Sequence, residues 1–444
     1  MDTNKALRIL TLLALAGPIA ATPSPAQYTG QTVRHHRIAE EEHDPYLVPA
    51  LIQAEKALDI RDFVTAENKL KHIVSDDDTN YRAWFDLGYL YTETRRDSEA
   101  IAAYRKSIAD KPDLFESNLN LGILLAEAGS PEAESYLRAA TKLKPSDTPD
   151  KGLERAWLSL GHVLEGKNPE DAIAAYREAA KLRPDDTEPH LAAGLFFEKQ
   201  SQLADAEREY QQVLQLDSKS AEGMAGLVNV YTKTQRLPEV EKMLRRYLEL
   251  NPGNETAHLQ LGRVLALRND ATGARAEYEA ALKLVPNDSE AQRELAGLDL
   301  AAGRYPEAAQ RYQALVKRHP TDPELHYALA SALLHAREFP AAQQALLETI
   351  KLKPDLAQAY GDLAVVAAEN KQYELAIRAL DTRGKLLPET PGTYFLRATS
   401  YDNLKAFKPA AENYRRFLDV AEGKYPDQEW QARHRLAAID PKNK

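Results

Sequence analysis

The side chains best suited to chemistry in this sequence are its histidines and paired carboxylates. Histidines that could serve as general acids or bases, or as metal ligands, stand at four separated positions: His162, His190, His258 and His326. Asp185 and Asp186 are one of several acidic pairs that could share proton transfer. The sequence has no G-x-S-x-G serine, no phosphate-binding glycine loop, no G-x-G-x-x-G pattern and no H-E-x-x-H zinc motif. We therefore predict that the protein is not an enzyme and has no cofactor.

A second cluster of chemically capable residues lies near the N-terminus. His35, His36 and His43 stand beside three glutamates at 40–42, a composition that could bind a metal ion. The segment that contains them, residues 27–45, has neither a helical nor an alternating apolar pattern. Because nothing fixes the geometry of these ligands, we predict a flexible leader without a metal site.

Composition excludes several further classes of function. The chain has 444 residues, with 57 basic and 67 acidic side chains and a formal net charge of −10. An acidic surface repels a phosphate backbone, so binding of nucleic acid is not expected. The absence of cysteine excludes disulfides, thiolate zinc sites and a cysteine nucleophile.

The first residues have the layout of a secretory signal peptide. Lys5 and Arg8 precede an apolar run at 9–21, and small residues follow at 22–26. The run is shorter than the ~20 residues that a membrane-spanning helix needs. We predict cleavage after Ala26 and a periplasmic or secreted protein with no transmembrane anchor in the mature chain; the alternative is that the segment stays as an anchor.

The elements that position these residues follow from an internal repeat. Prolines recur at intervals of 34 residues, which is the mark of a repeat array: Pro252, Pro286, Pro320, Pro354 and Pro388. In ten of the eleven units a small residue, such as Gly88, is followed on the next predicted helix by a second one, such as Ala100. Small residues let two antiparallel helices approach closely where they cross. Four residues further on, a large residue such as Tyr104 shares the face of the second small residue.

This pattern resembles the tetratricopeptide repeat family. The motif is clearest in one unit, at Trp84, Leu87, Gly88, Tyr91, Ala100, Tyr104 and Pro112. The resemblance implies an all-α, right-handed superhelical solenoid of about eleven helix-turn-helix repeats over residues 46–424. Residues 425–444 are predicted to form a capping helix and tail, with Trp430, Leu436 and Ile439 covering the open end. The unusually long connection at 146–155 is interpreted as a surface insertion, and the alternative is a bend or a contact loop.

The family resemblance also implies where a partner would bind. The fifth, ninth and thirteenth residues of each repeat line a concave groove in such proteins. In repeats two to five these positions supply a candidate protein-binding groove: Phe85, Tyr89, Glu93, Leu119, Ile123, Glu127, Leu158, His162, Leu191 and Leu195. The alternative is that the fifth-position residues only pack between adjacent first helices. The family places packing residues at the fourth position, which His190, His258 and His326 occupy.

Two functions remain open on the sequence. The first is a non-catalytic exported scaffold that binds a protein or peptide through the groove. The second is a component of envelope polysaccharide synthesis or export that contacts glycan. Exposed aromatic platforms would favour glycan and an apolar stripe would favour protein, but Phe85, Tyr89, Tyr327 and Phe395 do not separate the two.

The predicted signal peptide can be tested directly. N-terminal sequencing of the protein recovered from outside the cytoplasm should begin at Gln27. Recovery of a chain that still begins with Met1 would contradict the cleavage and the compartment inferred from it.

Overall fold

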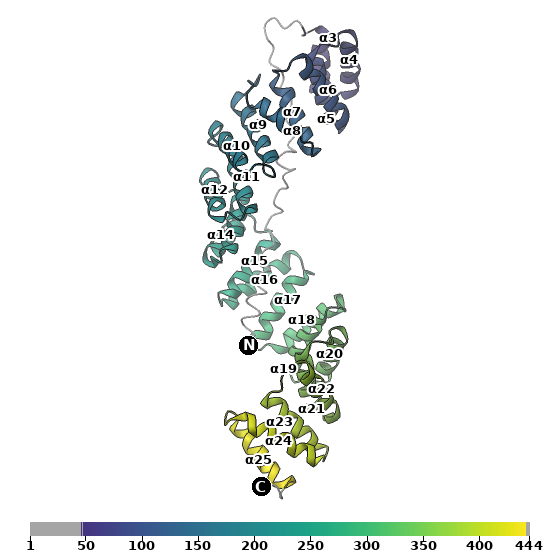
Figure 1. The fold of residues 1–444 in the computed structure, drawn as a ribbon, viewed down its shortest axis with the longest axis vertical. Helices are drawn as coiled ribbons and strands as arrows, with labels where there is room; N and C mark the ends of the chain where they lie inside the picture. The colour runs from purple at the N-terminus through teal and green to yellow at the C-terminus, as the bar shows by residue number, and fades with distance from the viewer. Residues whose placement is uncertain (1–45, 47, 441–444) are drawn as a thin grey trace. The chain divides into compact units, whose positions relative to one another are not determined.

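The computed structural model describes Tyr46 and residues 48–440. The predicted signal peptide at 1–26, the predicted leader at 27–45 and the last residues of the predicted tail, 441–444, lie outside the described residues. Within the described part every regular element is a helix, and the helices follow one another in pairs (Figure 1). The predicted all-α repeat solenoid is confirmed.

The first helices of the eleven pairs are α3 (Pro49–Asp59), α5 (Tyr81–Glu93), α7 (Phe115–Glu127), α9 (Pro149–Leu164), α11 (Glu188–Lys199), α13 (Ala221–Lys233), α15 (Glu255–Leu267), α17 (Ser289–Ala301), α19 (Pro323–His335), α21 (Ala357–Glu369) and α23 (Pro391–Asn403). The second helices are α4 (Phe63–Asp76), α6 (Asp97–Asp110), α8 (Ala133–Ala140), α10 (Pro169–Leu182), α12 (Leu203–Leu216), α14 (Leu237–Leu250), α16 (Ala271–Leu284), α18 (Tyr305–Arg318), α20 (Phe339–Leu352), α22 (Tyr373–Leu386) and α24 (Phe407–Ala421). A last helix, α25 (Pro426–Ile439), follows.

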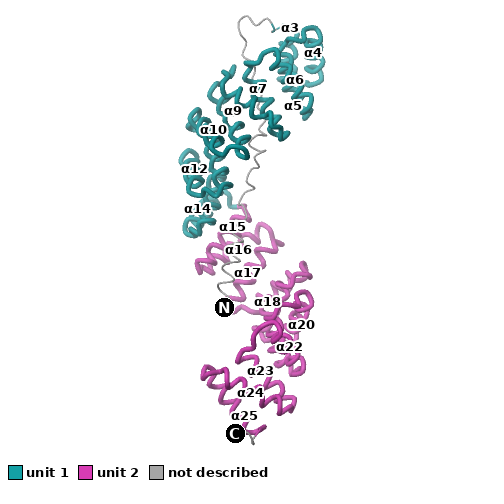
Figure 2. Tube along the Cα trace, viewed as in Figure 1, with its two compact units in different colours: residues 1–252 teal, residues 253–444 magenta. Residues whose placement is uncertain are grey.

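The chain divides into two compact units, at residues 1–252 and 253–444 (Figure 2). Within each unit every first helix packs against its own second helix, and every first helix after α3 in unit 1 and after α15 in unit 2 also packs against the second helix of the preceding repeat. Successive first helices also touch, as α3 and α5 do in unit 1 and α19, α21 and α23 do in unit 2. The first helices therefore form one layer in each unit. We call the face of this layer that is turned away from the second helices the inner surface.

Each hairpin is held together by a large side chain that packs against a helix backbone. A Cβ atom added at Gly88 would lie 2.6 Å from the ring of Tyr104, and one added at Gly161 would lie 2.5 Å from the ring of Tyr176. Both tyrosines are 1% exposed. Glycine is therefore required at these positions because any side chain would occupy the space of the ring.

The turn inside the hairpin also has a similar backbone conformation in most repeats. Ten turns place a residue in the left-handed region of backbone conformation, at Arg61, Arg95, Gly129, Ser201, Gln235, Asn269, Gly303, Arg337, Lys371 and Lys405. At the second turn the amide of Arg96 donates to the carbonyl of Tyr91 at 2.8 Å, and the amide of Arg95 donates to Thr92 at 3.1 Å. This is a Schellman motif, which ends the first helix and starts the second at a fixed angle.

Adjacent repeats are joined by ion pairs. Each pair links the second helix of one repeat to the turn inside the next hairpin. Glu67 binds Arg96 at 2.9 Å and Glu207 binds Arg236 at 2.8 Å. The corresponding residues of repeats seven and eight are both arginines, Arg275 and Arg304. Asp299, 1% exposed, lies between them and also binds Arg311 at 3.0 Å. Burial opposes ionisation of Asp299, but hydrogen bonds from these arginines hold its pKa below its usual value.

The long connection at 146–155 differs from the surface insertion that the sequence suggested. Residues from Pro149 onward add a turn to the start of α9. Gly152 is buried, and a Cβ atom there would lie 2.9 Å from Pro145. Ser146 is fixed because its hydroxyl donates to Glu116 at 2.6 Å. The segment is thus part of the packing between repeats three and four.

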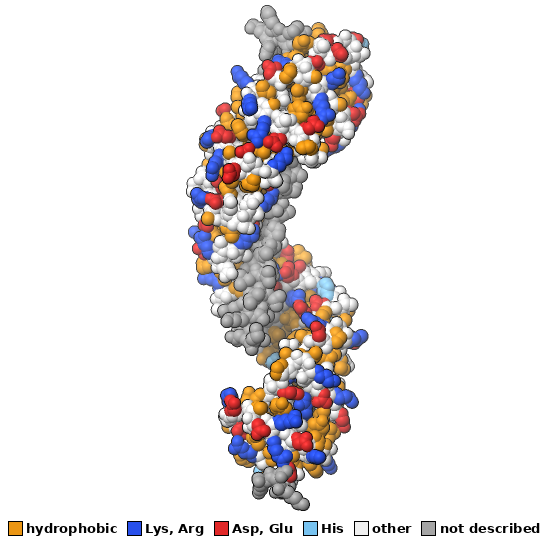
Figure 3. Space-filling view, viewed as in Figure 1, with side chains coloured by type: hydrophobic (Ala, Val, Ile, Leu, Met, Phe, Trp, Pro, Cys, Tyr) orange, Lys and Arg blue, Asp and Glu red, His pale blue; other side chains and the backbone are white. Residues whose placement is uncertain are grey.

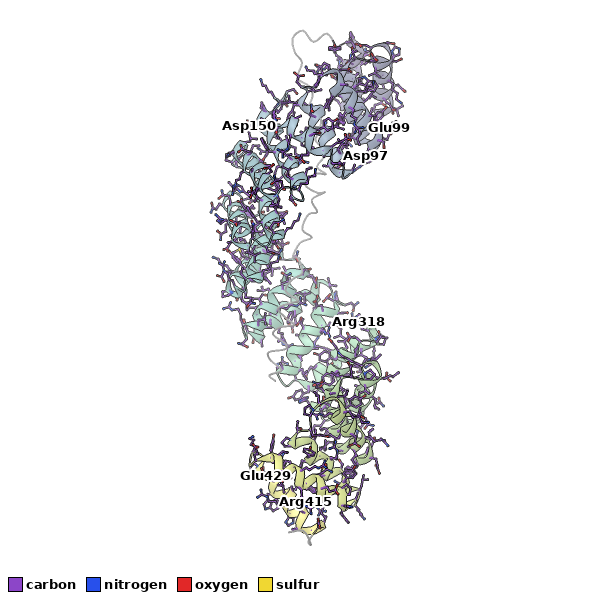
Figure 4. The ribbon with its side chains drawn as sticks, in the orientation of Figure 1. Asp97, Glu99, Asp150, Arg318, Arg415 and Glu429 are labelled. Atoms are coloured by element: carbon purple, nitrogen blue, oxygen red, sulfur yellow. The ribbon has the colours of Figure 1, made fainter. Side chains whose placement is uncertain are left out.

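The last helix, α25, packs on α24. Ala432 is buried, and Leu436 and Ile439 pack against the cluster that contains Phe417. Trp430 is 69% exposed, so the expectation that it covers the open end is wrong. It stacks instead on His434, one helical turn away, at 5.3 Å between ring centroids. Figure 4 places Arg415 on α24 and Glu429 on α25.

The glycine contacts lead to a paired stability prediction. Gly88→Ala should lower the free energy of unfolding by about 1–3 kcal/mol, because the new methyl group would displace the Tyr104 ring. Gly297→Ala is the matched control, since the nearest atom to its new Cβ would be the Tyr312 hydroxyl at 3.7 Å. That control should stabilise the protein by up to about 1 kcal/mol through helix propensity. Urea unfolding followed by circular dichroism measures both; equal effects would contradict this account.

Candidate functional site

The predicted groove residues of repeats two to five differ widely in their exposure. The buried ones are Phe85, Leu119, Ile123, Leu158 and Leu191. The half-buried ones are Tyr89, Glu93, His162 and Leu195, and Glu127 is exposed. A partner can therefore contact only the half-buried and exposed members of this set, because the buried members are already enclosed.

The two aromatic residues on α5 show this contrast at close range. Phe85 is 1% exposed and its ring centroid lies 5.9 Å from that of Tyr104. Its position fits the packing alternative for fifth-position residues. Tyr89 packs against the same core but is only partly buried. Burial and the charge of Glu93 raise the pKa of Tyr89, so its hydroxyl stays protonated and able to donate.

His162 belongs to a polar network in repeats four and five. Its Nδ1 lies 2.9 Å from the hydroxyl of Tyr176 and 3.3 Å from Glu165 Oε1. The Tyr176 hydroxyl donates to Glu165 at 2.7 Å, and Lys199 binds the other oxygen of Glu165 at 2.9 Å. Burial acts against ionisation of Glu165, but these hydrogen bonds outweigh it and lower its pKa to about 2. The network is a satisfied structural cluster without a nucleophile.

Similar bonds recur along the inner edge of both units. Glu198 accepts from the Tyr210 hydroxyl at 3.1 Å and binds Lys233 of the next first helix at 2.8 Å. In the last repeat the Tyr414 hydroxyl donates to Asp402 at 3.2 Å. Sequence reasoning missed these carboxylates. The signal was present, because each acid stands eleven or twelve residues before a tyrosine of the repeat.

The three fourth-position histidines have structural partners. His190 and His258 place Nδ1 at 2.7 Å from Glu209 and Glu277, respectively. His326 places Nε2 at 3.0 Å from the carbonyl of Pro320. These contacts agree with the packing role that the family resemblance implies.

The described residues contain no metal-binding cluster. No group of three or more histidines and carboxylates in this part of the chain could hold a metal ion. The candidate ligands His35, His36 and His43 lie outside the described residues. No helix in the described ranges is long and apolar enough to cross a membrane.

Acidic and basic side chains are interspersed on the visible face of both units (Figure 3). Most ion pairs among the described residues include at least one exposed side chain, and a single pair of this kind adds little to stability.

Family comparison identifies the class of protein. One tetratricopeptide repeat family model matches residues 53–115, 162–221, 293–356 and 336–385, and a second matches residues 197–258. Together they cover more than half of the chain. The protein is an all-α repeat protein with paired helices, and it belongs to the tetratricopeptide repeat family. No catalytic family is indicated, and no curated protein matches the sequence.

Solved structures give similarities over parts of the chain. YrrB, described as a TPR protein with an unusual peptide-binding site, is 23% identical; the match covers 42% of this chain and 96% of YrrB, with a TM-score of 0.39. A MamA protein is 25% identical over 39% of this chain and 94% of its own, with a TM-score of 0.36. PilF of Pseudomonas aeruginosa is 21% identical over 50% of this chain and 99% of its own, with a TM-score of 0.37. At these scores the similarities bear on neither partner nor function.

The network around Glu165 predicts a pH dependence of stability. A carboxyl whose pKa is lower in the folded state contributes stability above its unfolded pKa, and this contribution is lost as pH falls toward the folded value. Glu165→Gln should lower the free energy of unfolding at pH 7 by about 1–3 kcal/mol. The difference from wild type should shrink between about pH 4.5 and 2.

Urea unfolding at pH 7 and at acidic pH measures this effect, with the exposed Glu369→Gln as control. A deficit in Glu165→Gln that is the same at both pH values would contradict the assigned role of the carboxylate.

Proposed function

We propose that this protein is a non-catalytic exported scaffold that binds a protein or peptide through the inner surface of repeats two to five. The observation that carries the proposal is a row on that surface which combines accessible apolar groups with carboxylates. Tyr89 and Leu195 are half-buried, and Glu127 is exposed. Glu93 already pairs with Arg61 at 3.3 Å. A partner with apolar side chains flanked by lysine or arginine complements this row.

A preformed surface favours binding of a flexible partner. Hairpins fixed by packed tyrosines and repeated turns lose little freedom when a peptide binds, so most of the ordering cost falls on the peptide. The membership of the chain in a repeat family supports this mode of recognition. The exported location rests on the N-terminal residues alone, which lead us to propose a periplasmic or secreted protein.

The glycan alternative has less support. Phe85 is 1% exposed and has no free face on which a sugar ring could stack. Tyr89, Tyr327 and Phe395 are half-buried, and the Tyr327 hydroxyl is engaged with Asp362 at 2.8 Å. Because no wide aromatic platform is available among these four residues, a protein partner is the preferred proposal.

Affinity capture from envelope extract of the source cell tests the proposal. The bait is the chain from Gln27 to Lys444, compared with a triple variant Tyr89→Ser, Glu127→Lys and Leu195→Ser. We expect the affinity of the variant for its partner to fall by about tenfold or more, which corresponds to about 1.4 kcal/mol of binding free energy.

The control variant changes Val64 and Leu347 to serine, because these apolar residues are exposed on second helices. It should retain the partner. Equal capture by wild type and both variants would place binding elsewhere on the chain, and selective binding of soluble glycans without protein would favour the alternative function.

A further inference from the structure

The C-terminal ends of four second helices in unit 2 have lysine at the same repeat position. These lysines follow one another at the 34-residue period and all are exposed: Lys283, Lys317, Lys351 and Lys385. In four of the six repeats of unit 1 the position holds another residue type: Ser75, Ala109, Gln215 and Glu249. The second helices of a repeat array run in the same direction, so their C-terminal ends lie along one edge. We call residues 283–285, 317–319, 351–353 and 385–387 the basic edge.

Most cations of the basic edge are not neutralised by a carboxylate. Lys351 binds Glu348 at 3.0 Å. Arg318, labelled in Figure 4, donates instead to the carbonyl of Asn287 and to the side chain of Gln292, which are uncharged. Among the described residues, no ion pair involves the other four cations of the edge: Lys283, Lys317, Lys353 and Lys385.

The carboxylates beside the basic edge are largely occupied. Asp288 and Asp322 each cap the next first helix and accept hydrogen bonds from its backbone amides. Glu389 binds Arg397 at 2.7 Å. Asp355 is exposed and forms no ion pair within the described ranges. Positive charge therefore exceeds available negative charge at this edge, although the chain as a whole is acidic.

The same edge exposes large apolar side chains. Two such residues follow directly after the first lysine and two after the last: Leu284 (42% exposed), Val285 (44%), Leu386 (42%) and Leu387 (36%). Lysine near a helix C-terminus compensates the helix dipole, and this accounts for the charge. It does not account for the apolar groups beside the charge, which leave water only if something covers the edge.

We propose that the basic edge of unit 2 binds the surface of an anionic phospholipid bilayer. Lysine is a flexible point charge that contacts lipid phosphates without fixed geometry, and the apolar side chains beside it enter the boundary between headgroups and acyl chains. A bilayer fits a row of exposed helix ends because it approaches all of them at once. An acidic peptide would have to be ordered along the row, at a cost in conformational entropy.

This contact goes beyond the proposed scaffold function. That function uses the inner surface of repeats two to five, in unit 1, whereas the basic edge belongs to unit 2. Membrane attachment and partner binding are therefore separate properties that different variants can remove.

Sedimentation with lipid vesicles tests the inference. The protein is the chain from Gln27 to Lys444, which lacks the apolar run at 9–21. The vesicles contain phosphatidylcholine and phosphatidylglycerol in equal parts, or phosphatidylcholine alone. The test variant combines Lys283→Glu, Lys317→Glu and Lys385→Glu. The matched control makes the same change of charge at exposed lysines in or beside the hairpin turns of unit 2, with Lys371→Glu, Lys405→Glu and Lys408→Glu.

Two further variants separate membrane binding from folding. Glutamate near a helix C-terminus opposes the helix dipole, so glutamine at the same three test positions gives a milder change. Leu284→Ser with Leu386→Ser removes apolar contact and leaves the charge unaltered. Thermal unfolding confirms that every variant is folded.

We expect wild type to bind the anionic vesicles and not phosphatidylcholine alone, and raised salt should weaken this binding. The partition constant should fall by about tenfold or more with glutamine at the three positions, and further with glutamate. The serine variant should bind about threefold or more weakly. The hairpin-turn control should bind as wild type does.

Failure of wild type to bind anionic vesicles, or equal loss in the test and control variants, would overturn the inference. Binding of soluble polyglutamate in place of vesicles would also overturn it and would assign the edge to an acidic peptide. Capture of a protein partner by the inner surface is measured separately, so none of these results contradicts the scaffold function.

Discussion

The contact between a small residue on the first helix and a large side chain on the second helix, present in ten of the eleven repeats, is the constraint on which the rest of this structure depends. Tyr104 and Tyr176 reach van der Waals contact with helix backbone because Gly88 and Gly161 have no side chain. A hairpin fixed in this way presents the same faces at every repeat. The position of each inner-surface residue is then determined by its place in the 34-residue period, because every hairpin has the same geometry.

Ion pairs add to this packing by linking neighbouring repeats. The pairs Glu67–Arg96 and Glu207–Arg236 tie one second helix to the next. Where the period places Arg275 beside Arg304, the buried carboxylate of Asp299 lies between them. A buried acid is tolerated there because several guanidinium groups compensate for its lost hydration. The array therefore accommodates a change of residue type without a change of backbone.

The fold could be predicted from the sequence because its determinants are local and repeated. Gly88, Ala100 and Tyr104 specify a hairpin within one unit, and the period extends it along the chain. The candidate site could not be predicted in the same detail. The exposure of a side chain depends on neighbouring residues, and these differ from one repeat to the next. Phe85 and Tyr89 both stand at predicted groove positions, yet one is buried and the other is half-buried. Trp430 was expected to cover the last repeat, but Ala432 occupies that contact.

The residues that the repeat does not require are the ones that carry information about function. A glycine at the hairpin crossing is explained by the tyrosine ring that packs against it, so its presence gives no information about a ligand. Glycine at 297 and 361 receives no ring and costs helix stability, so the packing of the hairpin does not account for it.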